Sequence, residues 1–190
     1  MTAPLILGFD TSAAHCAAAL VRGDTVLVAV GEEMARGQAE RLMGLLEEVL
    51  NGQGMTWADL DALAVGTGPG NFTGIRIGVS AARGLALGLG CPAYGVTGFE
   101  ARTRLAPDGT TVAIPAPRDT AYVTESGKAQ LRPVAEVSNP APHPAPAELA
   151  TAIALHAASV WPTETPPPAP LYVRQPDAAP ARDAPPPILP

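Results

Sequence analysis

The chain has 190 residues, enough for one domain or two small lobes. Its net charge of -6 argues against independent binding of DNA or RNA, because neutralising phosphates requires clustered lysine and arginine, and the twelve basic residues are scattered. Apolar residues make up 47% and aromatic residues only 4%, so we expect an aliphatic core.

The first hundred residues alternate strand-like and helix-like stretches. Short apolar runs predict three strands in meander order, at 5–10, 15–22 and 24–32. An i, i+3, i+4, i+7 pattern predicts a helix over 36–51, ended by Gly52 and Gly54. Further elements follow in the order strand, helix, strand, helix, at 60–66, 73–89, 91–96 and 99–106. This order is that of the ribonuclease-H-like fold, which actin-like ATPases use twice.

The second half predicts a shortened copy of the first. Three strands are expected at 111–117, 120–126 and 129–137, and one helix at 146–158. Fifteen of the 22 prolines follow Ser138, which limits regular structure there. We therefore expect an α/β, actin-like (ribonuclease-H-like) fold with a mixed sheet flanked by helices. Its parts are an N-terminal lobe (1–101), a smaller, degenerate C-terminal lobe (102–175) and an extended Pro/Ala-rich tail (176–190).

Cysteine and histidine usage predicts neither a disulfide nor a metal site. Cys16 and Cys91 are far apart and lack a CxxC spacing, so we interpret them as buried, reduced thiols. The three histidines, His15, His143 and His156, stand alone. The N-terminus lacks a basic leader, and no apolar run approaches the ~20 residues that a transmembrane helix needs. We therefore expect a cytoplasmic protein.

Asp10 ends the first predicted strand, where ribonuclease-H-like enzymes place an acid. A two-metal nuclease needs further carboxylates; Glu47 or Glu48 could supply one, but the fourth strand ends in Gly66 and Thr67. An actin-like ATPase instead needs two phosphate loops. The turn Asp10-Thr11-Ser12 suits a metal-bound phosphate but lacks glycine, and two prolines interrupt the second loop at 115–119. This turn is either a structural polar turn or a residual nucleotide contact.

The stretch GTGPGNFTGIRIG (66–78) has the composition of a phosphate loop, but it fits neither Walker A nor the dinucleotide fingerprint. Gly68-Pro69-Gly70-Asn71 predicts a type II turn, followed by a helix cap at Asn71 or Thr73. Free amides there could still attract an anion. The nucleotide-contact hypothesis therefore names Asp10, Thr11, Gly68 and Gly70.

The two predicted helices carry apolar or small residues on more than one side, which one sheet face would not cover. Gly74, Gly78, Ala81, Ala82 and Leu85 would allow a second helix to approach closely. We expect either a partner protein or the second lobe to cover this surface. In the partner hypothesis, Gly78→Leu abolishes pairing and leaves the monomer folded. The predicted contact residues are Leu42, Met43, Leu46, Val49, Leu50, Ile75, Gly78, Ala82 and Leu85.

Four segments carry a resemblance to a known family: ILGFDTSAAHCAAAL, RGQAERLMGLLEEVL, LDALAVGTGPGNFTGIRIGVSAARGLA and PAYGVTGFEA. They resemble the TsaB (YeaZ) family over residues 5–101, and GPGNFTGIRIG is the most specific part. Two shorter stretches, TAYV (120–123) and PLYVRQPDAA (170–179), resemble further landmarks of the family.

The resemblance implies a non-catalytic, actin-like subunit of the bacterial tRNA threonylcarbamoyladenosine machinery. Such a subunit pairs through the helices at 36–51 and 73–89 with the catalytic paralogue TsaD, which holds metal and ATP and modifies adenosine 37 of tRNAs reading A-starting codons. A small ATPase, TsaE, joins them, and a homodimer is possible without the partner. Catalytic relatives have an HxxxH metal pair at the helix start, where this sequence reads RGQAERL with Gln38. The alternative is an actin-like ATPase or phosphotransferase using Asp10 and the 66–74 loop.

Overall fold

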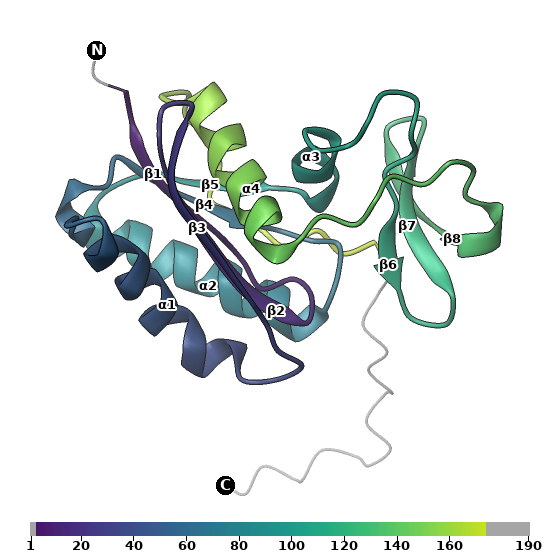
Figure 1. The fold of residues 1–190 in the computed structure, drawn as a ribbon, viewed down its shortest axis with the longest axis horizontal. Helices are drawn as coiled ribbons and strands as arrows, with labels where there is room; N and C mark the ends of the chain where they lie inside the picture. The colour runs from purple at the N-terminus through teal and green to yellow at the C-terminus, as the bar shows by residue number, and fades with distance from the viewer. Residues whose placement is uncertain (1–2, 174–190) are drawn as a thin grey trace, which may run out of the picture.

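The computed structural model describes residues 3–173, and its larger part is built on a five-stranded mixed sheet (Figure 1). The central strand β1 (Leu5–Asp10) pairs antiparallel with β2 (His15–Arg22) and parallel with β4 (Ala62–Gly66). The edges are β3 (Thr25–Glu33) and β5 (Ala93–Val96), which gives the order β3-β2-β1-β4-β5. The three-strand meander and the presence of two later strands are as the sequence predicts.

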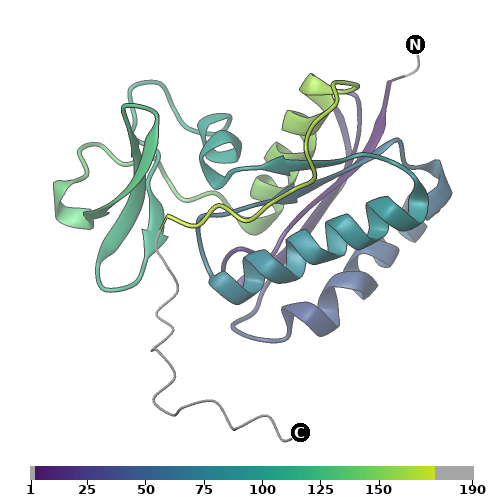
Figure 2. The same ribbon diagram turned by 180° about the vertical axis from the view of Figure 1, so that it is seen from behind.

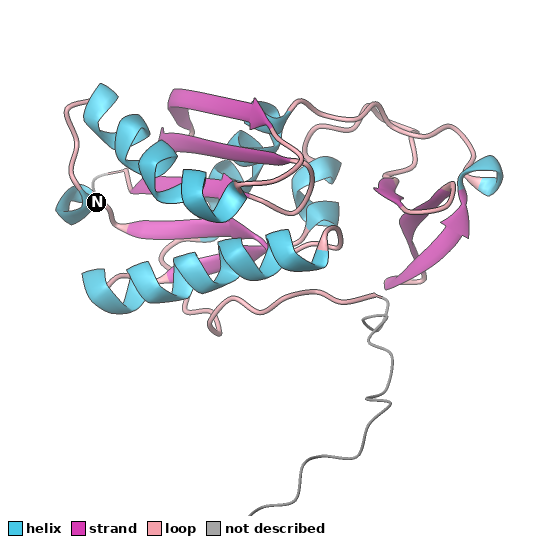
Figure 3. Cartoon of the chain, turned by 90° about the horizontal axis from the view of Figure 1, so that it is seen from below, coloured by secondary structure: helices cyan, strands magenta, loops and turns pink. Residues whose placement is uncertain are grey.

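Helices cover both faces of this sheet. The helices α1 (Gln38–Gly52) and α2 (Phe72–Leu89) lie together on one face, and α4 (Pro146–Val160) lies on the other (Figures 1 and 3). Alternate residues of β1 explain the two cores: Leu5, Leu7 and Phe9 pack with α1 and α2, whereas Ile6 packs with α4. All of β1 is buried, as expected for a central strand covered on both faces.

The position of α4 differs from the lobe division that the sequence suggested. That division at residue 101 assigned the helix to the second lobe, but α4 lies across β2, β1 and β3 of the first sheet. Alanines make this close approach possible, because Ala150, Ala154 and Ala157 face the alanines of β2 and β4 in one core. The first sheet therefore depends on a helix that begins fifty residues after the end of its last strand.

The remaining segments form a small second sheet and the two connections that lead to it and back from it. After α3 (Gly98–Thr103), the strands β6 (Ile114–Ala116), β7 (Thr120–Glu125) and β8 (Lys128–Pro133) pair in sequence order (Figure 2). Short 3-10 helices occur at Trp57–Asp59 and Val134–Glu136. The three predicted strands are confirmed, although Thr111 only forms an isolated bridge with Pro140.

After α4 the chain returns past β5 toward the start of α2. Tyr94 donates a hydrogen bond from its hydroxyl to Thr163 O (3.0 Å), and Leu171 N donates to Thr67 O (2.8 Å). The expected tail at 176–190 lies outside the described residues. Within residues 3–173, none of the helices combines the length and apolarity needed to cross a membrane. Strand order and flanking helices confirm the actin-like, ribonuclease-H-like fold, with a second sheet that is much smaller than the first.

Gly8 on β1 sets the closeness of α4 to the sheet. A Cβ at this position would lie 2.7 Å from Ala154 Cβ and 2.8 Å from Ala154 N. Gly8→Ala should therefore lower the free energy of unfolding by about 1–3 kcal/mol through overpacking. Urea denaturation measures this change.

Gly84 on α2 provides the matched control, because no atom of the described residues lies within 4 Å of a Cβ built there. Gly84→Ala should raise the free energy of unfolding by about 0.5–1 kcal/mol, the usual gain for removing a mid-helix glycine. Equal effects of the two substitutions would contradict the close α4–β1 packing.

Candidate functional site

The turn between β1 and β2 is a buried polar cluster centred on Asp10. Its side chain is only 1% exposed, and Oδ2 accepts hydrogen bonds from Ser12 Oγ (2.9 Å) and, at longer range, from Ser12 N (3.3 Å). His15 Nε2 lies 2.6 Å from the same oxygen. The carboxylate thus has partners within its own turn, which supports the structural interpretation of Asp10-Thr11-Ser12.

Four glycines of the 66–78 stretch fit around this turn, and we call them the glycine clasp: Gly66, Gly70, Gly74 and Gly78. A Cβ at Gly66 would collide with Asp10 Oδ1, one at Gly70 with Ser12 O and one at Gly74 with Thr11 O. At Gly78 it would lie 2.8 Å from Thr11 Oγ1. Each glycine is therefore required by a contact with residues 10–12.

Hydrogen bonds fasten the clasp to the turn. Thr11 donates from Oγ1 to Gly74 O (2.7 Å), and Asn71 N donates to Ser12 O (2.7 Å). Asn71 also caps α2, since its Oδ1 accepts from Gly74 N (2.8 Å), as the sequence predicts. Two of the amides that a phosphate loop would present are thus already donating within the chain.

The predicted type II turn at 68–71 is wrong. Such a turn requires positive φ at Gly70, but the structure places positive φ at Gly68 (+90°) and not at Gly70. The peptide bond between Gly68 and Pro69 is cis. Gly68 O accepts from Gly98 N (2.7 Å), so this residue joins α3 to the loop.

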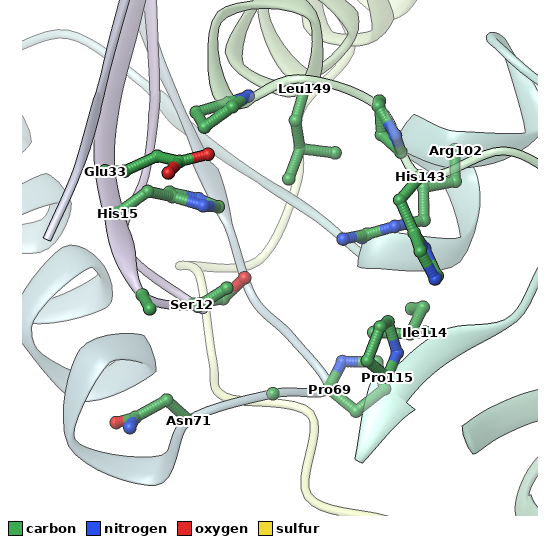
Figure 4. A pocket seen from close by; sticks show the side chains of 15 residues that line it. Ser12, His15, Glu33, Pro69, Asn71, Arg102, Ile114, Pro115, His143 and Leu149 are labelled. Atoms are coloured by element: carbon green, nitrogen blue, oxygen red, sulfur yellow. The ribbon is translucent and has the colours of Figure 1, made fainter. Parts of the chain in front are cut away.

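A cavity of about 450 Å³ opens between the two sheets beside this turn (Figure 4). Ser12 and His15 line it from the β1–β2 turn, Gly70 and Asn71 from the clasp, and Arg102 from α3. Of the four residues in the nucleotide hypothesis, only Gly70 lines this space; Asp10 and Thr11 are each 1% exposed, and neither they nor Gly68 lines it.

Arg102 and His143 are cavity residues that the sequence patterns did not reveal. In Figure 4 the Arg102 guanidinium points into the cavity, with His143 beside it. Arg102 Nη1 donates a long hydrogen bond to Gly98 O (3.3 Å), whereas Nε is buried without a partner. Burial lowers the pKa of this guanidinium, and the negative charge of Asp10 opposes that shift. No spacing in the sequence links α3 to the loop before α4, so this pair had no sequence signal.

The metal-nuclease arrangement is absent from the described residues. Glu47 and Glu48 are exposed on α1, and Glu48 forms a salt bridge with Arg41 (2.6 Å) instead of approaching Asp10. Within residues 3–173, no group of three His, Cys, Asp or Glu residues is placed to hold a metal. Cys16 is free and buried, and burial, followed by the charge of Glu32, raises the pKa of its thiol to about 11. A thiolate nucleophile at neutral pH is therefore disfavoured.

Most of the predicted partner-contact residues lie in the chain's own core, which corrects that assignment. On α1, Met43 is 40% exposed, and on α2, Leu85 is partly buried. The buried ones are Leu42, Leu46, Val49, Leu50, Ile75, Gly78 and Ala82. Leu45, on the same helix as Leu42 and Leu46, is also buried at 1%. A stripe wider than 100° fits against one sheet face, so these residues do not require a second surface.

The expected outcome of Gly78→Leu changes for the same reason. Gly78 faces the chain's own sheet, where a Cβ would lie 2.8 Å from Thr11 Oγ1 and 3.3 Å from Val65 Cγ2. A leucine at this position would disrupt the monomer, so the substitution is no test of pairing.

Comparison with known proteins agrees with this architecture. Residues 29–164 match the family model described as "TsaD: tRNA N6-adenosine threonylcarbamoyltransferase". The tRNA threonylcarbamoyladenosine biosynthesis protein TsaB of Escherichia coli is 41% identical over 92 residues, which cover 48% of this chain and 39% of that protein. The chain thus spans less than half the length of this relative. The uncharacterized protein Rv3421c of Mycobacterium tuberculosis is 32% identical, with 92% of this chain and 94% of that protein covered.

Among solved structures, YeaZ from Pseudomonas aeruginosa superposes with a TM-score of 0.65 at 25% identity. The superposition covers 89% of this chain and 99% of the YeaZ chain. Family model, sequence relatives and structure agree with the motifs in the first hundred residues. The chain therefore belongs to the TsaD family and, within it, to the TsaB (YeaZ) group.

Proposed function

We propose that this chain is a non-catalytic scaffold subunit in threonylcarbamoylation of adenosine 37 of tRNAs that read A-starting codons. It acts by pairing with a catalytic TsaD-type paralogue, which holds the ATP and the metal. A TsaE-type ATPase joins the pair, and tRNA reaches this chain only through the complex. The support is membership of the TsaB group combined with the exposed residues on the outer faces of α1 and α2 within residues 3–173.

The outer face of α2 suits close approach by another helix. Ile77, Ala81, Gly84 and Gly88 recur at spacings of three and four residues, and no atom of residues 3–173 lies within 4 Å of a Cβ at Gly84 or Gly88. Leu87 is 86% exposed, and Met43 on the neighbouring helix α1 is 40% exposed. We assign the pairing surface to these residues in place of the buried ones.

The start of α1 supports a structural rather than a catalytic role. At Gln38, where the resemblance places a histidine pair in catalytic relatives, the side-chain amide donates to Met34 O (3.2 Å). The same nitrogen lies 3.5 Å from Ala13 O, beside the buried Asp10 turn. Gln38 thus ties α1 to this turn, and the position offers an amide that is already hydrogen-bonded.

Reconstituted modification tests the proposal directly. The full chain is mixed with a TsaD-type subunit, a TsaE-type ATPase, unmodified tRNA and the activated threonylcarbamoyl donor. Modified adenosine should form with all proteins present and fall to background without this chain, whereas this chain without the TsaD-type subunit should form none. Full modification without the chain would refute the scaffold role.

Gly84→Arg tests the pairing surface. The position is exposed and helical with open space around it, so the monomer should fold normally, but a long charged side chain would keep a partner helix at a distance. We expect affinity for the TsaD-type subunit to fall about tenfold or more, equivalent to about 1.4 kcal/mol. Light scattering and co-purification measure the complex.

Ser159→Arg is the matched control, because Ser159 is likewise exposed and helical but lies on α4, on the opposite face of the sheet. This variant should pair normally. Normal pairing of both variants would place the interface elsewhere on the chain.

Asp10→Ala separates the scaffold role from the ATPase alternative. Removing the carboxylate leaves Ser12 and His15 without their buried partner, so the free energy of unfolding should fall by about 1–3 kcal/mol. The wild-type chain alone should show no Mg-ATP binding by calorimetry. Micromolar binding that Asp10→Ala abolishes, while the variant stays folded at the temperature of the titration, would favour the ATPase.

A further inference from the structure

Arg102 is the least satisfied polar side chain near the cavity between the two sheets. Its Nε is buried without a hydrogen-bond partner, and the long bond from Nη1 to Gly98 O (3.3 Å) is the only one recorded for the side chain within residues 3–173. Buried donors are normally paired, and a guanidinium has five N–H groups to satisfy. The protein therefore keeps a partly buried cation whose donors have spare capacity.

The surroundings of Arg102 leave this positive charge largely unopposed. Asp10 acts on it electrostatically without a recorded hydrogen bond, and that carboxylate already accepts from Ser12 and His15. Glu33 is the only acid among the described residues that line the cavity, and Figure 4 shows it beside His15, away from Arg102. Ser12, Asn71 and His143 add polar groups to the lining.

We propose that this cavity binds a phosphate-type oxyanion, held by the Arg102 guanidinium with His143 beside it. A planar guanidinium presents paired N–H groups that match two oxygens of such an anion. The volume of about 450 Å³ is ample for a single phosphate with water. An anion in the cavity would satisfy the donors of Arg102 and bridge α3 to the loop before α4.

The residues of this site differ from those in the nucleotide hypothesis, which is based on Asp10 and the 66–74 loop. Asp10 and Thr11 are buried, and the amides of Asn71 and Gly74 already donate to Ser12 O and Asn71 Oδ1. The proposed ligand group instead depends on Arg102 and His143, which belong to neither segment. Free phosphate and the phosphate of a nucleotide share this chemistry, and titration with each distinguishes the two sources.

Histidine ring NMR offers a direct measurement, because the sequence has only three histidines. His15 and His143 line the cavity, whereas His156 on α4 does not and serves as an internal reference. Titration of the full chain with inorganic phosphate, and separately with ADP, at constant pH and ionic strength should shift the His143 and His15 signals saturably. Arg102→Met should weaken this binding by about tenfold or more, the usual factor for a hydrogen bond to a charged group.

Arg104→Met is the control, since Arg104 is an exposed arginine two residues away. It should bind phosphate as the wild type does. His143→Gln changes an exposed side chain, so it should fold normally and weaken binding several-fold even if Arg102→Met fails to fold. Without phosphate, Arg102→Met should unfold at or above the wild-type temperature, because it removes an unpaired buried donor.

If inorganic phosphate shifts the histidine signals saturably and ADP does not, the ligand is a free anion. If ADP shifts the same signals as phosphate does, the site accepts the phosphate of a nucleotide. The proposal would be overturned if neither phosphate nor ADP gave saturable shifts. It would also be overturned if the two single variants, Arg102→Met and His143→Gln, both bound phosphate as tightly as the wild type. The titration uses this chain alone, so its result does not depend on the pairing function.

Discussion

The contact between the glycine clasp and the β1–β2 turn is the constraint on which the rest of the structure depends. Backbone oxygens of Thr11 and Ser12 occupy the space that side chains at Gly74 and Gly70 would need. This contact fixes the start of α2 against the end of β1. Because β1 is the central strand and its neighbours are built on it, the position of α2 relative to the whole sheet follows from four missing side chains. The resemblance to a phosphate loop arises because both kinds of loop need glycine for close approach, here to the chain's own backbone instead of a ligand.

The same contact explains why the small residues of α2 fall into two groups, one that packs against the sheet and one that faces outward. Gly74, Gly78 and Ala82 point at the sheet, where space is short, whereas Gly84 and Gly88 face open space. A glycine in a helix costs about 0.5–1 kcal/mol relative to alanine, and only the inward ones regain this through packing within the chain. Packing within the chain does not offset the cost of the outward glycines. For this reason the outward glycines, and not the inward ones, indicate a surface that another helix approaches.

The order of elements could be predicted from the sequence because each strand and helix of the first hundred residues shows its own periodicity. The strands at 5–10 and 15–22 and the helix at 146–158 fall within a few residues of β1, β2 and α4. Which surface α4 covers could not be predicted, since an alanine-rich helix carries little directional pattern and fits any flat alanine-lined sheet. Which α2 glycines face the sheet and which face outward could not be predicted either, because glycine has no side chain whose polarity would indicate a buried or an exposed position. The cavity residues Arg102 and His143 meet only through the folding of α3 and the loop before α4.

Helix α2 physically connects the two surfaces for which functions are proposed. Its first turn is held by Asn71 and Thr11 beside Ser12, which lines the cavity, while the half-buried Ile77 and Ala81 and the exposed Gly84 lie on the face assigned to pairing. Arg76 strengthens the same end by donating to the Tyr172 hydroxyl (2.8 Å) and lying over the Phe72 ring (3.8 Å). Protein interiors are close-packed, and the clasp leaves no room for α2 to slide without moving residues 10–12. A partner that displaced α2 would therefore also change the shape of the cavity, whereas one that docks without moving it would leave the cavity intact.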